Sequence, residues 1–133
     1  MMSQLHARTA YASVAGSTRV EGADPHRLIM LLFEEGLDCI TRVELGLMNG
    51  ATDVAGQAAA KARSILTALK GSLDFEKGGR IAADLEAIYT YCQDRLAAAI
   101  RMRDAAFAKE AKSVFSEIAD GWQAIASDPA VRR

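Results

Sequence analysis

Apolar residues recur at steps of three and four along most of the chain, and this period is typical of amphipathic α-helices. The first such segment begins at Asp24-Pro25, where the Asp carboxylate can accept hydrogen bonds from the free N–H groups of a first helical turn. We predict a helix from Pro25 to Met48, because Asn49-Gly50 is a common kind of helix end.

The same period predicts three further helices. One covers Thr52–Leu73, and its apolar stripe comprises Val54, Ala58, Ala62, Ile65, Leu69 and Leu73. The residues Asp74–Gly79 are expected to form a connection. The next helix carries the stripe Ile81, Leu85, Ile88, Cys92, Leu96 and Ala99. The last is expected to end at Asp128-Pro129 and carries Phe107, Ala111, Val114, Ile118, Trp122 and Ile125.

Long helices joined by short links pack as antiparallel neighbours. The sequence therefore predicts an all-α fold, an antiparallel up-down four-helix bundle over residues 24–127. Residues 1–23 are interpreted as an N-terminal arm or a short extra helix, and residues 128–133 as a loose C-terminal tail. Composition agrees, because alanine is the commonest residue and only 2 prolines occur among 133 residues.

The helix predicted over residues 25–48 is more apolar than a bundle helix needs to be. Its core stripe comprises Ile29, Leu32, Phe33, Gly36, Cys39, Ile40, Val43 and Leu47. Further apolar residues fall outside that stripe, namely Met30, Leu31, Leu37, Leu45 and Met48. A surplus of this kind is covered either by another part of the chain, here the arm, or by a partner protein. The two alternatives are compatible if the arm is a lid that covers these residues in the free protein and competes with the partner for them.

Charge and hydropathy narrow the class of protein. The net charge is -1, whereas nucleic-acid-binding domains are usually basic. The longest apolar run, Leu28–Phe33, is far shorter than the roughly 18 residues of a membrane span. The N-terminus lacks the pattern of a signal peptide, and 2 cysteines are too few for a disulfide framework. We therefore expect a cytoplasmic protein that binds no nucleic acid and does not insert into membranes.

Catalytic chemistry has no clear place on these helices. A di-metal site in a bundle needs Glu-x-x-His pairs, but neither His6 nor His26 follows a Glu at that spacing. The string Gly78-Gly79-Arg80 matches no phosphate-binding pattern and favours a turn. Cys39 and Cys92 lie on core stripes without a basic partner in register. We predict a protein that is not an enzyme and holds no metal or cofactor.

Several strings of residues, taken in their order and spacing, resemble the FliS family of flagellar export chaperones. The first is Asp24–Gly36, in which a Pro is followed by Leu-Ile and then by an aromatic-acidic-Gly string. The second combines Ile65-Leu66, Leu69, Ser72-Leu73-Asp74, Gly78-Gly79, Ile81-Ala82, Leu85 and Tyr89. The third is the aliphatic stripe from Val114 to Trp122, and Tyr11 stands where the family usually has an N-terminal Tyr. The chain departs from the family at Phe33, Asp84 and Ile100, where the family often has Tyr, Asn and Asn.

The resemblance implies a chaperone that binds the disordered C-terminal segment of flagellin. Such a protein prevents premature polymerisation and supports delivery to the flagellar type III export apparatus, whose export gate is a further candidate partner. An amphipathic partner helix would lie in an apolar groove. The candidate groove and arm residues are Tyr11, Val14, Leu28, Ile29, Phe33, Leu37, Leu45, Leu66, Leu73 and Tyr89.

One alternative is a helical adapter or regulatory binding protein with no role in flagellin export. It would use the same kind of groove for another partner. In either case, we expect the free protein to be a monomer or a weak homodimer. Recovery of flagellin with the protein would separate the two hypotheses.

Overall fold

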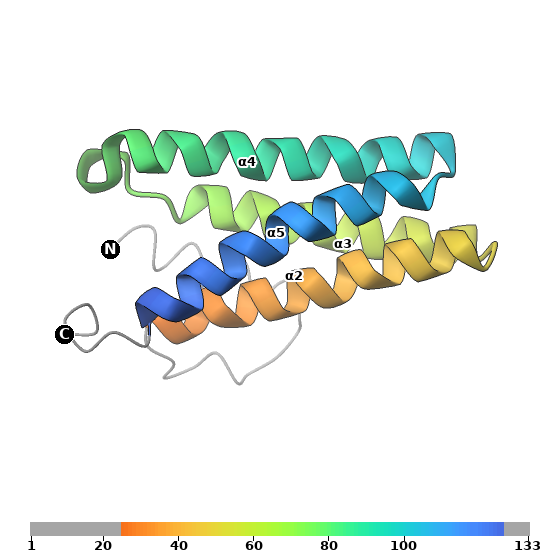
Figure 1. Ribbon diagram of the computed structural model, residues 1–133, viewed down its shortest axis with the longest axis horizontal. Coiled ribbons are helices and arrows are strands. Elements are labelled where there is room, and N and C mark those ends of the chain that lie inside the picture. The colour runs from red at the N-terminus through yellow and green to blue at the C-terminus, as the bar shows by residue number, and fades with distance from the viewer. Residues whose placement is uncertain (1–24, 127–133) are drawn as a thin grey trace.

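The computed structural model describes residues 25–126, which form four long helices and no strand (Figure 1). The helices are α2 (Pro25–Met48), α3 (Thr52–Gly71), α4 (Phe75–Met102) and α5 (Ala105–Ala126). The bounds predicted for the first helix are confirmed. The predicted arm at residues 1–23, the tail at residues 128–133 and the helix end at Asp128-Pro129 lie outside the described residues.

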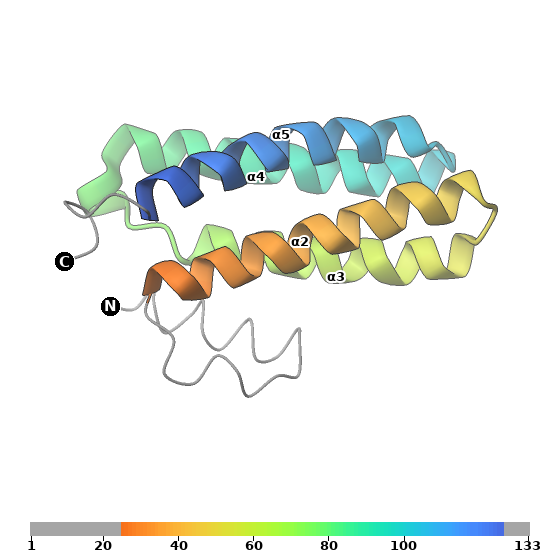
Figure 2. The same cartoon turned by 60° about the horizontal axis from the view of Figure 1, so that its bottom comes forward.

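The four helices form a closed ring in which each helix packs against two others. Helix α2 packs on α3 and α5, and α4 packs on the same two helices, whereas α2 and α4 touch only slightly. Figure 2 shows this arrangement as two layers, with α4 and α5 in one and α2 and α3 in the other. Because short turns join consecutive helices, neighbours in the chain run antiparallel. The predicted up-down four-helix bundle is confirmed.

The interior of the described bundle is apolar, with no buried polar or charged residue. The rings of Phe33 on α2 and Phe115 on α5 meet at its centre, with centroids 5.2 Å apart. Helix α3 contributes many small side chains, which allow the neighbouring helices to approach closely. Its buried alanines are Ala55, Ala58, Ala59, Ala62 and Ala68.

Two stripe positions predicted from the sequence are wrong. Val54 in the first turn of α3 is 54% exposed, and Ile81 on α4 is 71% exposed. On α5, Phe115 is fully buried, whereas the predicted stripe residues Val114 and Ile118 are only half-buried. The stripe on α5 is thus centred one residue further along, because a bundle helix packs on two neighbours and buries a wider face than one stripe.

The surplus apolar residues of α2 are only partly absorbed by the bundle. Leu31 is buried, and Leu37 is half-buried and packs against the core. Leu45 and Met48, towards the end of the helix, are 50% and 66% exposed. Helix α2 has neighbours on two sides, which accounts for the wide buried face without placing the helix at the centre.

The predicted connection between α3 and α4, over Asp74–Gly79, is also wrong. Helix α3 ends at Gly71, before the predicted Leu73, and α4 begins at Phe75. The side chain of Asp74 caps the new helix, because its Oδ1 accepts hydrogen bonds from the backbone N–H of Glu76 and of Lys77, both at 3.1 Å. Gly79 then interrupts α4 with φ 48° and ψ -119°. The segment is therefore a capped helical turn followed by a break.

Candidate functional site

A pocket of about 550 Å³ lies at the end of the bundle where α2 and α4 begin and α3 and α5 end. This volume is within the usual range for ligand sites, about 300–1,000 Å³. All four helices contribute to its wall. The apolar lining consists of Leu28, Ile29, Phe33, Leu69, Leu73, Ile81, Ala82, Leu85, Tyr89, Ile118 and Trp122. The remaining lining residues are His26, Ser72, Asp74, Gly78, Glu117 and Gly121.

Small residues line the pocket near the beginning of α4 and the end of α5. Gly78 and Gly121 line it, and a Cβ added at Gly121 would meet no other atom within 4 Å. The break at Gly79 lies between the capped first turn of α4 and the rest of that helix. The lining residues Ile81, Ala82 and Leu85 follow this break. Local backbone geometry at Gly79 therefore sets the position of one wall.

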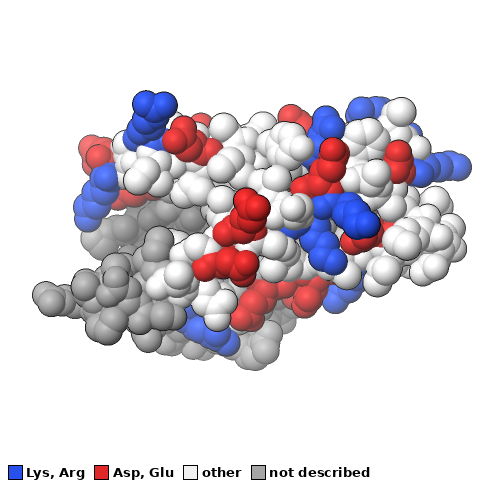
Figure 3. Space-filling model, viewed as in Figure 1, with Lys and Arg blue, Asp and Glu red and all other residues white. Residues whose placement is uncertain are grey.

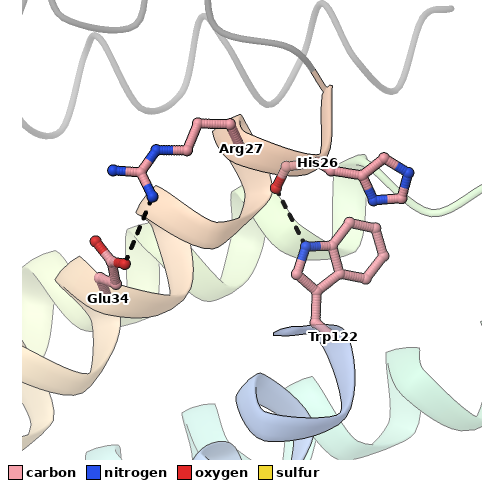
Figure 4. Close-up of polar contacts among 4 residues, drawn as sticks. All are labelled: His26, Arg27, Glu34 and Trp122. Atoms are coloured by element: carbon pink, nitrogen blue, oxygen red, sulfur yellow. Dashed lines mark hydrogen bonds and ion pairs between the residues drawn. The ribbon is translucent and has the colours of Figure 1, made fainter. Parts of the chain in front are cut away.

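His26 and Trp122 connect α2 to α5 at the edge of the pocket (Figure 4). Their rings are stacked with centroids 5.0 Å apart, and Trp122 Nε1 donates a hydrogen bond to the His26 carbonyl oxygen at 3.2 Å. The Nδ1 atom of His26 is buried and has no hydrogen-bond partner. Figure 4 also shows an exposed ion pair further along α2, between Arg27 and Glu34 at 4.0 Å.

The structure brings together half of the candidate residues taken from the sequence. Of those described, five line the pocket, namely Leu28, Ile29, Phe33, Leu73 and Tyr89. Three do not line it: Leu66 is buried in the core, Leu37 packs against the core, and Leu45 is half-exposed towards the other end of α2. Tyr11 and Val14 lie outside the described residues.

Sequence reasoning missed several lining residues on the last helix and at the first turn of α2. The sequence placed Trp122 on the apolar stripe of the last helix, offered His26 only as a metal ligand that lacks the required Glu, and gave Glu117 no role. A usable signal exists, since an up-down bundle brings the start of α2 and the end of α5 to the same end. The approach of these residues then follows from the topology, and not from any local motif.

Burial holds the phenol of Tyr89, which lines the pocket, and the thiols of Cys39 and Cys92 in their neutral forms. Burial raises the pKa of the Tyr89 phenol well above its ordinary value and raises the pKa of Cys92 to about 11. Burial, together with the nearby Glu35 carboxylate, raises the pKa of Cys39. Neither thiol ionises at neutral pH, so neither is an activated nucleophile. In residues 25–126, no group of three or more potential metal ligands comes together.

The outer surface is mixed in charge. Figure 3 shows acidic side chains gathered over α5 and α2 on one face, with basic side chains interspersed towards the end that holds the α4–α5 turn. Within residues 25–126, three ion pairs join neighbouring helices, at N–O distances of 2.9 to 3.6 Å: Glu35 with Lys61, Glu44 with Lys112, and Arg95 with Glu110. Among the helices of residues 25–126, none has the length and hydropathy to cross a membrane.

Comparison with known proteins places this bundle in a family. A model of the family described as flagellar protein FliS matches residues 7–129. The chain is 38% identical over 117 residues to the flagellar secretion chaperone FliS of Salmonella typhimurium, which covers 87% of each chain. It is 31% identical over 124 residues to the flagellar secretion chaperone FliSB of Pseudomonas aeruginosa, covering 93% of this chain and 98% of that protein.

A more distant relative is the flagellar secretion chaperone FliS of Vibrio cholerae, 24% identical over 116 residues and covering 87% of this chain. These relatives are named as secretion chaperones and not as enzymes. The family match includes all four helices and every residue that lines the pocket. The chain therefore belongs to the FliS family of flagellar proteins.

Proposed function

We propose that this protein is a cytoplasmic flagellar secretion chaperone that binds the disordered C-terminal segment of flagellin in the pocket between its helix ends. The observation that carries the proposal is the apolar pocket at which Leu28, Phe33, Leu73 and Tyr89 meet. Family membership and the names of the relatives support the chaperone role. An apolar pocket with few polar groups suits the apolar face of an amphipathic helix.

The mechanism follows from the cost of ordering a disordered chain. A segment that folds on binding loses conformational entropy, so a large buried apolar surface must compensate. While the segment is held, it is unavailable for contacts with other flagellin subunits, and premature polymerisation is prevented. The bound complex is then the form presented to the flagellar type III export apparatus, with the export gate as a second partner.

Calorimetric titration of the full chain with the isolated C-terminal segment of flagellin tests the proposal. Burial of apolar surface predicts binding with a negative heat-capacity change, together with a gain of helix in the segment. An adapter for another protein would give no binding to flagellin. The absence of binding at tens of micromolar protein would refute the proposal.

A matched pair of substitutions tests the location of the site. Ile81→Asp places a charge on the pocket lining at a residue that is 71% exposed, so the bundle is expected to remain folded. Val54→Asp makes the same change at a residue that is 54% exposed and lies outside the pocket. Ile81→Asp is expected to weaken binding by about 1–3 kcal/mol, and Val54→Asp by much less. Equal affinities for the two variants would place the segment elsewhere.

A further inference from the structure

Among residues 25–126, the acidic residues that line the pocket are Asp74 and Glu117, and no Lys or Arg lines it. An occupant with a basic side chain beside its apolar residues would match this lining, whereas an acidic one would meet like charge.

The two carboxylates differ in what they already bind. Oδ1 of Asp74 accepts two backbone hydrogen bonds, from Glu76 and Lys77, and so is used in capping α4. Glu117, on α5, is exposed and makes no hydrogen bond or ion pair with any residue of the described part of the chain. Glu117 is therefore the carboxylate that is available to an occupant.

Elsewhere in the described bundle, two glutamates of α2 pair with basic side chains on neighbouring helices. Glu44 on α2 pairs with Lys112 on α5 at 3.5 Å, and Glu35 on α2 pairs with Lys61 on α3 at 2.9 Å. At the pocket, no basic side chain from α2, α3 or α4 lines the wall opposite Glu117. A basic side chain of a bound segment could therefore pair with the Glu117 carboxylate.

His26, on the wall formed by α2, also carries an unpaired polar atom. The Nδ1 atom of His26 is buried but has no hydrogen-bond partner, although His26 lines the pocket. This atom is not accessible from the pocket, so an occupant could bind it only after a rotation of the His26 ring. An occupant that is wholly apolar would leave Glu117 without a partner.

We propose that the flagellin segment bound in the pocket carries a Lys or Arg next to its apolar anchors, and that Glu117 pairs with this residue at the pocket edge. The inference rests on the proposed function, because it specifies the chemistry of the segment held at that site. Apolar side chains fill the pocket and supply most of the affinity. The Glu117 pair fixes the direction and register in which the segment lies, as charged rim contacts do in other interfaces.

Charge reversal on α5 provides the test, with a matched control on the same helix. Glu117→Lys and Asp120→Lys change the net charge equally, and both residues are exposed, but only Glu117 lines the pocket. We expect Glu117→Lys to weaken binding of the flagellin segment by roughly five- to ten-fold at low salt, and Asp120→Lys to leave it nearly unchanged. The difference should shrink at about 0.5 M salt, because exposed charges are then screened.

Exchanging the charges identifies the partner residue. Each Lys or Arg of the segment is replaced in turn by Glu, and one such segment should bind the Glu117→Lys variant more tightly than it binds the wild-type protein. Equal affinities for the Glu117→Lys and Asp120→Lys variants would overturn the inference and leave the proposed function standing. If Glu117→Lys instead weakens binding only of a peptide of residues 1–24, the occupant is the chain's own N-terminal segment and the inference is also overturned. Failure of the wild-type protein to bind flagellin would refute the proposed function itself.

Discussion

Gly36 and Phe115 show how a single missing side chain sets the distance between two helices. Gly36 on α2 faces the ring of Phe115 on α5, and a Cβ built on Gly36 would lie 2.8 Å from a ring carbon. Phe115 is fully buried and is in contact with Phe33, so its ring has little room to move. The glycine is therefore required by packing between α2 and α5.

Gly36→Ala is expected to lower the free energy of unfolding by about 1–3 kcal/mol, because the added methyl group forces α2 away from Phe115. Gly56→Ala is the control, since a Cβ at Gly56 on α3 meets nothing within 4 Å. That change should raise the free energy of unfolding by about 0.5–1 kcal/mol through helix propensity. Urea denaturation of both variants measures the difference, and equal stabilities would contradict the packing argument.

Cys92 predicts a pH dependence of stability. Its pKa is raised from 9.0 to about 11 by burial, so the folded thiol resists ionisation that the unfolded thiol does not. Below pH 9 the thiol is neutral in both states, and the free energy of unfolding is at its full value. As the pH rises from 9 towards 11, only the unfolded thiol ionises, and the free energy of unfolding falls by about 1.4 kcal/mol per pH unit. Urea denaturation between pH 8 and about pH 10 should show this decline, and Cys92→Ala should make it shallower. The same slope in both proteins would show that another group is responsible.

At the scale of single residues, the sequence predicts burial well where the helical period is unambiguous and fails where neighbours decide. Ile65, Leu69 and Leu96 are buried as predicted. Val54 and Ile81 satisfy the period equally well but lie near helix ends, where no partner covers them. Burial depends on which helices lie alongside, and the period of one helix does not contain that information.

For single elements, the beginning of α4 is where local sequence signals predict the structure least well. The string Gly78-Gly79-Arg80 favoured a turn, and the structure has a break at Gly79, but a helical turn precedes it. Asp74 is a good N-cap residue and indicates an earlier helix start, whereas the glycines that follow so closely indicate a turn. The same segment then forms part of the pocket wall.

Gly79→Ala tests whether this break is required. The residue has a positive φ of 48°, which an L side chain adopts only with strain, so we expect a loss of about 1–3 kcal/mol in the free energy of unfolding. Gly71→Ala at the end of α3 is the control, since Gly71 has no positive φ and a Cβ there meets nothing within 4 Å. Thermal unfolding measures the stability of both, and titration with the flagellin segment reports the pocket. An undisturbed Gly79→Ala variant with unchanged affinity would show that the break is incidental.

At the scale of the whole molecule, the bundle could be predicted from the sequence but the pocket could be predicted only in part. The helical period and short links specify the up-down topology, and the topology brings four helix ends together. The candidates Leu28, Leu73 and Tyr89 meet at that end. The same reasoning also selected Leu45 and Leu66, because an apolar residue outside a stripe does not reveal which end of the bundle is hollow. The position of the pocket depends on the helix ends and on the break at Gly79, so it is a property of the assembled fold.

The most direct test of the account is to map the binding site by methyl NMR on the full chain during titration with the C-terminal segment of flagellin. We predict that the largest chemical-shift changes occur at methyl groups that line the pocket, those of Leu28, Leu73, Leu85 and Ile118. The methyl groups of Leu45 and Val54, which are exposed and do not line it, should change little. Large changes at Leu45 and Val54 with an undisturbed pocket would contradict the central claim that flagellin is held between the helix ends.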